Sequence, residues 1–99
     1  MLTLPIQKKW LDMICSGIKK EEYRAVIPYW TKRFKTIGLL DKFGKPTGEE
    51  RIIRLRAGYG NNMPEAKIRV SISKGFGKPE WGADPRIVYW KLGIKEMEK

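Results

Sequence analysis

Lysine, glutamate and arginine follow one another closely in the segment Gly17-Ile18-Lys19-Lys20-Glu21-Glu22-Tyr23-Arg24. In a cleft, Lys19 and Arg24 would contact a phosphate or the edge of a base, and the guanidinium would do so through two parallel hydrogen bonds. Glu22 could orient either cation or accept a hydrogen bond from an exocyclic amine. The same three side chains could instead form a salt-bridge network that holds a strand against its neighbours. The sequence leaves both interpretations open.

A short helix and a strand are expected to position these side chains. Apolar residues recur at helical spacing over residues 7–16 and predict a helix. Residues 20–24 predict a strand, on which Glu22 and Arg24 share one face because successive strand side chains alternate. Lys19 lies just before this strand, and its long side chain could reach round to the same side.

The rest of the chain is predicted to be mostly strand. Pro28 suits the first turn of a second helix, and residues 40–50 are rich in glycine and proline and predict a loop. Further strands are expected over residues 1–6, 51–56, 66–73 and 86–92, the last of them a central strand because both its faces carry apolar side chains. About five strands and two short helices predict a single α+β domain over residues 1–99, a compact β-barrel with helices covering its ends.

Positive charge extends along the whole chain. Lysine and arginine number 21 against 11 acidic residues, which gives a formal net charge of +10. A domain-wide positive field attracts polyanions, and nucleic acid is the most abundant polyanion in a cell. The alternative is a charged surface that serves solubility alone.

Composition excludes several kinds of site. No stretch approaches the roughly 20 consecutive apolar residues of a membrane span, and the first residues lack the features of a secretory leader, so we expect a cytoplasmic protein without a membrane partner. Histidine is absent, which removes the usual Ser-His-Asp and Cys-His arrangements, and the single cysteine, Cys15, is expected to be a buried helix residue. The acidic residues do not cluster as in two-metal nucleases, so neither a metal nor a cofactor is expected.

The pattern G-x-K-x-x-E-x-R over residues 17–24 resembles the signature of the ASCH domain (activating-signal-cointegrator homology), a relative of the PUA RNA-binding domain. The similarity covers nearly the whole chain, which resembles the small stand-alone ASCH proteins of bacteria and phages. It includes Leu4-Pro5-Ile6, Pro28-Tyr29-Trp30 with Arg33, Gly58-Tyr59, Trp81-Gly82-Ala83 and the closing segment from Tyr89 to Gly93. The resemblance implies a PUA-like β-barrel whose cleft is lined by the motif, and an association with RNA.

RNA, or a nucleotide or nucleoside piece of it, is therefore the expected ligand of a cleft around Lys19, Glu22 and Arg24. Five further residues are expected to extend that cleft: Lys8, Lys9, Arg33, Tyr59 and Trp81. The two aromatic residues among them lie beside glycines in predicted loops, and single-stranded RNA is held by bases that stack on such side chains. The other three tryptophans are expected in the core: Trp10, Trp30 and Trp90.

Two other classes of function stay open. A small enzyme could use Lys19 and Glu22 as catalytic acid and base on RNA or a modified nucleoside. Cleavage of RNA is favoured over hydrolysis of N4-acetylcytidine, because Glu22 occupies the position where the resemblance implies a threonine nucleophile, and the next threonine, Thr31, falls in a predicted helix. A protein-interaction module would instead expose an apolar patch around Phe43 or Phe76.

Overall fold

The structure is a computed structural model, which describes residues 1–60 and 62–98. Its strands are β1 (Thr3–Pro5), β2 (Glu21–Ala25), β3 (Arg51–Arg56), β4 (Glu65–Phe76) and β5 (Val88–Glu98), and its helices are α1 (Lys8–Cys15), α2 (Pro28–Thr36) and the short 3₁₀ helix η1 (Pro79–Trp81). The five strands form one sheet in the order β1-β3-β4-β5-β2, in which only the β1–β3 pair is parallel.

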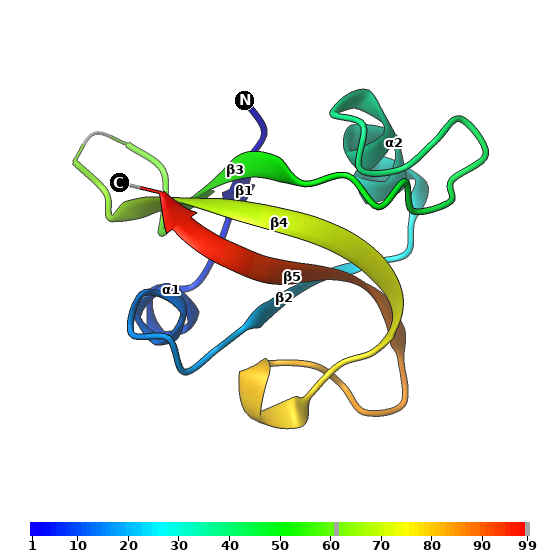
Figure 1. Cartoon of the computed structure of the whole chain (residues 1–99). Helices are drawn as coiled ribbons and strands as arrows, with labels where there is room; N and C mark the ends of the chain where they lie inside the picture. Colours follow the sequence, from blue (N-terminus) through cyan, green and yellow to red (C-terminus); the bar gives the residue numbers. More distant parts are fainter. Residues whose placement is uncertain (61, 99) are drawn as a thin grey trace.

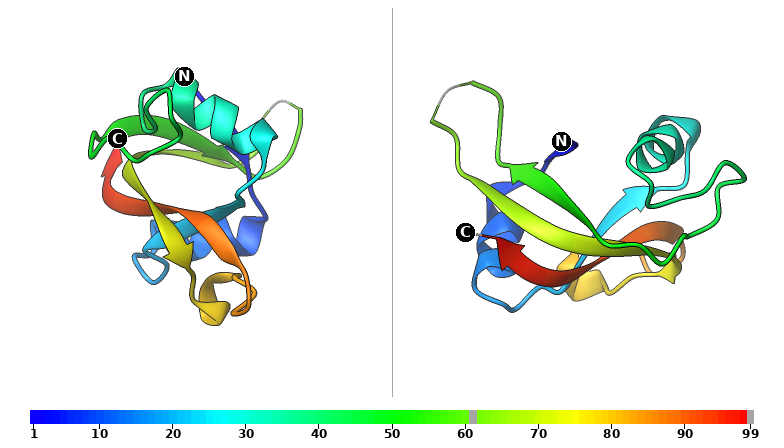
Figure 2. Two further views of the ribbon diagram at one scale, coloured as in Figure 1. Left: turned by 90° about the vertical axis from the view of Figure 1, so that its right-hand side faces the viewer. Right: turned by 45° about the horizontal axis from the view of Figure 1, so that its top comes forward.

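The sheet curls into a half-barrel with α1 and α2 at opposite ends, as Figures 1 and 2 show. The predicted class, a small α+β barrel-like fold with five strands and two short helices, is thereby confirmed. Strand β5 pairs with β4 on one side and β2 on the other, in agreement with the interior position expected from its apolar side chains.

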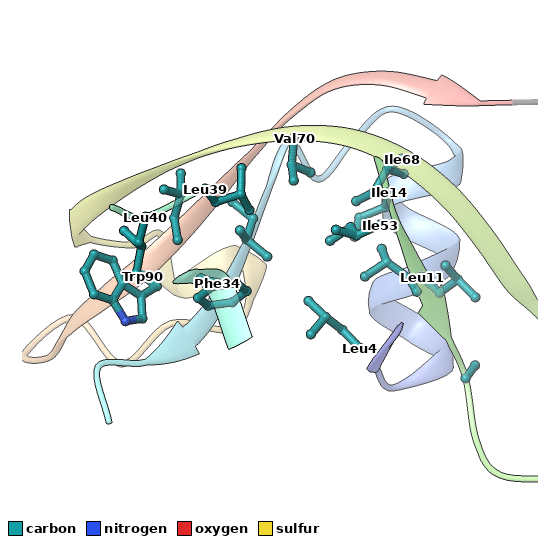
Figure 3. Packing of buried hydrophobic residues seen from close by; sticks show 14 residues of the cluster. Leu4, Leu11, Ile14, Phe34, Leu39, Leu40, Ile53, Ile68, Val70 and Trp90 are labelled. Carbon is teal, nitrogen blue, oxygen red and sulfur yellow. The ribbon is translucent and has the colours of Figure 1, made fainter. Parts of the chain in front are cut away.

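Alternating side chains of the strands build the core on the concave side of the sheet. Ile53 and Leu55 of β3 and Ile68 and Val70 of β4 have no exposed surface, as the period of two predicts. The two α-helices add the buried side chains Leu11, Ile14 and Phe34, and β5 adds Trp90 and Leu92. In Figure 3, Leu11 and Ile14 lie towards one end of this cluster and Trp90 towards the other.

The helices form where the sequence predicts them, with differences in what they bury. Pro28 occupies the first turn of α2. Cys15 is exposed, so its predicted burial is wrong: it is the last residue of the helix, one turn beyond the buried Leu11. Trp10 is only half-buried, because its ring lies beside the loop that follows β4 rather than inside the core.

Strands β4 and β5 are longer than predicted. Gly75 and Phe76 lie beyond the predicted strand end at residue 73 and continue β4, because they pair with Tyr89 and Val88 of β5. Strand β5 runs past its expected end to Glu98, and it crosses a register shift at Arg69 and Val70 of β4. No helix within residues 1–60 and 62–98 combines the length and the apolar character that crossing a membrane demands.

Candidate functional site

Arg24 links the two edges of the half-barrel. Its Nη1 donates a hydrogen bond to the carbonyl oxygen of Tyr23 (2.7 Å) and lies 2.9 Å from Oε2 of Glu22. Its Nη2 donates to the carbonyl oxygen of Pro5, the last residue of β1. Because β1 and β2 are the edge strands of the sheet, this guanidinium bridges the gap that the backbone ladder leaves open.

Lys19 is buried beneath this bridge, with 1% of its surface exposed. Its Nζ lies 3.2 Å from Oε1 of Glu22 and donates a hydrogen bond to the carbonyl oxygen of Trp81. The ammonium also lies 5.1 Å from the ring centre of Trp10 and 4.8 Å from that of Tyr23. Burial lowers the pKa of Lys19, and the attraction of Glu22 partly opposes that shift.

Lys19, Glu22 and Arg24 thus form the salt-bridge network that the sequence left as one interpretation. Glu22 is at its centre, 5% exposed, and its Oε1 also accepts the backbone N–H of Tyr23 at 3.0 Å. The network does not exclude a ligand site, because Glu22 and Arg24 also line a cavity. Lys19 does not line it. Its ammonium contacts Glu22 and the carbonyl oxygen of Trp81, and it thereby holds two residues of the wall in place.

This cavity, here called the aromatic cleft, has a volume of about 230 Å³. Its wall consists of Pro5, Ile6, Gln7, Trp10, Glu22, Tyr23, Arg24, Trp81, Gly82 and Tyr89. Four of these residues are aromatic, and the Glu22–Arg24 ion pair and Gln7 supply the polar groups. The aromatic cleft therefore combines stacking surfaces with hydrogen-bonding groups of both kinds.

One wall of the aromatic cleft is the loop over residues 77–84, which η1 interrupts. Tyr23 holds its start, since the phenol oxygen accepts the backbone N–H of Lys78 at 3.0 Å. Tyr89 holds its end by accepting the N–H of Asp84 at 3.0 Å. Gly82 allows close packing in the middle: its φ of 102° favours glycine, and a Cβ there would lie 3.1 Å from the Trp10 ring.

Gly77→Ala is expected to lower the free energy of unfolding by about 1 to 3 kcal/mol through overpacking. A Cβ at Gly77 would lie 2.6 Å from Cε1 of Tyr23 and 2.7 Å from Cβ of Ala83, and neither neighbour is free to move away. Urea unfolding followed by tryptophan fluorescence measures the loss. Gly75→Ala is the matched control, since its new Cβ would meet only the flexible Lys91 side chain at 3.6 Å. Equal stability of the two variants would contradict this account of the loop.

The Tyr23 phenol is expected to cause part of the fall in the free energy of unfolding at alkaline pH. Burial raises the pKa of Tyr23 to about 12, and Glu21, which accepts the phenol hydrogen bond at 2.9 Å, acts in the same direction. The unfolded chain ionises first, from the ordinary value of 10.0, so this contribution is complete below that pH and is lost as the pH rises towards 12. In Tyr23→Phe the free energy of unfolding, measured with urea from pH 10 to about 12, should therefore fall less steeply with pH. Tyr59→Phe, at a residue that is 88% exposed, should leave it unchanged.

The other predicted site residues fall at different distances from the aromatic cleft. Trp81 lines it. Lys9 lies outside the lining, with Nζ 4.3 Å from the ring centre of the lining residue Trp10. Lys8 also lies outside the lining and pairs with Asp12 at 2.8 Å on the exposed side of α1.

Arg33 and Tyr59 also lie outside the lining of the aromatic cleft. The Arg33 guanidinium lies 3.5 Å from the ring centre of Tyr29, on α2. Tyr59 lines a separate depression together with Arg56 and Pro5. Only Pro5 is shared with the aromatic cleft, so a ligand would need to extend past β1 to reach Tyr59.

Six lining side chains were not predicted as site residues: Pro5, Ile6, Gln7, Trp10, Tyr23 and Tyr89. Helical spacing predicts Trp10 in the core, but that spacing does not show which helix face meets the loop 77–84. Tyr89 alternates with the buried Trp90, so its position on the other face follows from the pattern, but its contact with Asp84 does not.

The residues that an amide hydrolase would need are not assembled. Thr31 accepts a hydrogen bond at its Oγ1 from Nε1 of Trp90 at 2.9 Å, and it does not line the aromatic cleft. The position occupied by Glu22 carries no hydroxyl, as the sequence indicates.

Known proteins offer no template for this site. No family model, no curated protein and no solved structure matches the chain. Its function is therefore inferred from the geometry of the aromatic cleft and from the charge around it.

Proposed function

We propose that the aromatic cleft binds one unstacked base of single-stranded RNA, or the same base in a free nucleotide or nucleoside. The observation that carries the proposal is the Glu22–Arg24 ion pair, 2.9 Å across, set among four aromatic side chains in one cavity. Bases stack on aromatic faces and are read at their edges by charged groups. The volume of about 230 Å³ is below the roughly 300 to 1,000 Å³ of sites for drug-sized ligands, so it suits one base.

Both members of the ion pair retain hydrogen-bonding capacity. A guanidinium has about five N–H donors, and Arg24 directs three of them to Tyr23, Glu22 and Pro5 within the described structure. Oε2 of Glu22 contacts Arg24, while its Oε1 takes the contacts from Lys19 and from the Tyr23 N–H. A base with an exocyclic amine next to a ring acceptor would donate to Oε2 and accept from Arg24. Adenine and cytosine have this pattern, and uracil lacks the amine.

Two lysines outside the lining lie over aromatic rings that do line the aromatic cleft. The Nζ atoms of Lys9 and Lys78 lie 4.3 Å and 4.5 Å from the ring centres of Trp10 and Trp81. Ammonium groups there would contact the phosphates next to a bound base. The net charge of +10 and the resemblance of the motif to the ASCH signature support the same ligand class.

Titration with cytidine and uridine, followed by tryptophan fluorescence, tests the proposal. Cytidine should bind more tightly than uridine, and Trp10→Leu should weaken cytidine binding by about 5- to 150-fold, as expected from base–aromatic stacking of about 1 to 3 kcal/mol. Phe43→Leu changes an exposed aromatic outside the aromatic cleft and serves as the control. Failure of the wild type to bind either nucleoside or single-stranded RNA would overturn the proposal.

The same RNA samples separate a binding protein from an enzyme. We expect the RNA to remain intact after incubation, because the ammonium of Lys19 is held by Glu22 and by the Trp81 carbonyl and does not line the aromatic cleft. Shortened RNA that persists after repurification of the protein, and that disappears in Lys19→Met, would assign ribonuclease activity instead.

A further inference from the structure

A second hollow lies on the outer face of the sheet beside η1. Its volume is about 440 Å³, and it is here called the lysine groove after the residues that define it: Lys20, Lys78, Lys91, Lys95, Phe76 and Trp81. Lys91, Gly93 and Lys95 of β5 line it and alternate with the buried Trp90 and Leu92, so it opens mainly on the side of the sheet opposite the core.

The charge of the lysine groove is only partly compensated. Lys91 lies 3.5 Å from the carboxylate of Glu21. Within residues 1–60 and 62–98, the ammonium groups of Lys20, Lys78 and Lys95 form no ion pair. Three like charges around one hollow repel each other. A polyanion bound there would attract all three ammonium groups and offset that repulsion.

Glycine keeps the floor of the lysine groove open. Gly93 stands in the middle of β5, where a strand usually benefits from a β-branched side chain. A Cβ added there would have no neighbour closer than the Ser71 carbonyl oxygen at 3.9 Å and would approach Nζ of Lys95 at 4.0 Å. The fold therefore has room for a side chain at this position, and the space it leaves faces the lysines.

Trp81 joins the lysine groove to the aromatic cleft, because it lines both. The Nζ atom of Lys78 lies 4.5 Å from the centre of the Trp81 ring. A strand whose base enters the aromatic cleft would meet the lysine groove as soon as its backbone passes Trp81. The two hollows thus supply the two kinds of contact that a single-stranded nucleic acid needs, a stacking site and a positively charged path.

We infer that the lysine groove binds the phosphodiester backbone of the RNA strand whose base occupies the aromatic cleft. This inference rests on the proposed function. The negatively charged phosphates lie over Lys20, Lys78 and Lys95, and Phe76, which is 61% exposed, offers a stacking surface to the neighbouring base.

The salt dependence of RNA binding tests the inference. The double variant Lys20→Gln/Lys95→Gln should reduce the slope of log K against log salt by about 1.4, since each of the two lost contacts with single-stranded nucleic acid contributes about 0.7. Neither lysine lines the aromatic cleft, so its cytidine affinity should stay within twofold of that of the wild type. The matched control removes two charges from exposed lysines of α2, Lys32→Gln/Lys35→Gln, on the opposite side of the sheet from η1 (Figures 1 and 2). Its slope should change little.

Gly93→Val provides a variant without a change in charge. The new side chain narrows the lysine groove, so RNA affinity should fall at least fivefold while cytidine affinity is retained. An unchanged RNA affinity in this variant, or equal slopes for the two double variants, would overturn the inference while cytidine binding still supported the proposed function. Loss of both cytidine and RNA binding in the wild type would overturn both.

Discussion

Glu22→Leu is expected to lower the free energy of unfolding by about 3 to 5 kcal/mol, because removal of one partner leaves a buried charge uncompensated. The partner is Lys19, whose side chain has no exposed surface and whose Nζ lies 3.2 Å from Oε1 of Glu22. The same substitution also removes the acceptor of the Tyr23 N–H and the carboxylate that faces Arg24. For a domain of this size the loss is a large part of a typical stability of 5 to 15 kcal/mol.

Two comparisons locate the cause of this loss. The double variant Lys19→Met/Glu22→Leu replaces the buried pair by apolar side chains and should recover much of the stability. Glu49→Leu removes an exposed carboxylate 3.4 Å from Arg51 and should cost no more than about 1 kcal/mol. Urea unfolding followed by tryptophan fluorescence measures all three variants. A Glu22→Leu variant as stable as the Glu49→Leu control would contradict the network described here.

Arg24→Met should weaken cytidine binding by about 10- to 150-fold, which corresponds to the 1.5 to 3 kcal/mol of a hydrogen bond to a charged group. The methionine keeps an unbranched apolar stem, is shorter than arginine and loses every donor. It also removes the bridge from β2 to the Pro5 carbonyl, so the two edges of the half-barrel lose their side-chain link at the wall of the aromatic cleft. Glu22 keeps its contact with Lys19, and we therefore expect a smaller loss of stability than in Glu22→Leu.

Arg33→Met is the matched control for Arg24→Met. It removes the same chemical group from α2, where the guanidinium lies over the ring of Tyr29 and does not line the aromatic cleft. Calorimetric titration with cytidine compares them directly, in buffer without urea and at a temperature at which both variants are folded. Similar affinities for the two variants would remove Arg24 from the proposed base contact and leave it as a structural link only.

The local sequence pattern determined the strands and much of the motif geometry. Strand β3 has the bounds predicted from residues 51–56, where Ile53 and Leu55 alternate with Arg54 and Arg56 in a β-prone segment. Glu22 and Arg24 share a face of β2, and Lys19 reaches them from the preceding turn, as the period of two and the length of a lysine side chain require. These relations depend on neighbours in the chain, and a sequence displays them directly.

The tertiary structure alone decided which of these groups line the aromatic cleft. The predicted strand ends at residues 73 and 92 were wrong, because β4 and β5 pair beyond them and no local pattern encodes that pairing. The same long-range contacts bring Trp81 to Lys19 across 62 positions of the chain and bury the lysine that the sequence offered as ligand-facing. They also assemble the aromatic cleft from α1, β2 and the loop 77–84, and place the lysine groove beside it. Such contacts arise from burial and packing between distant segments, and for that reason periodicity and composition could not predict them.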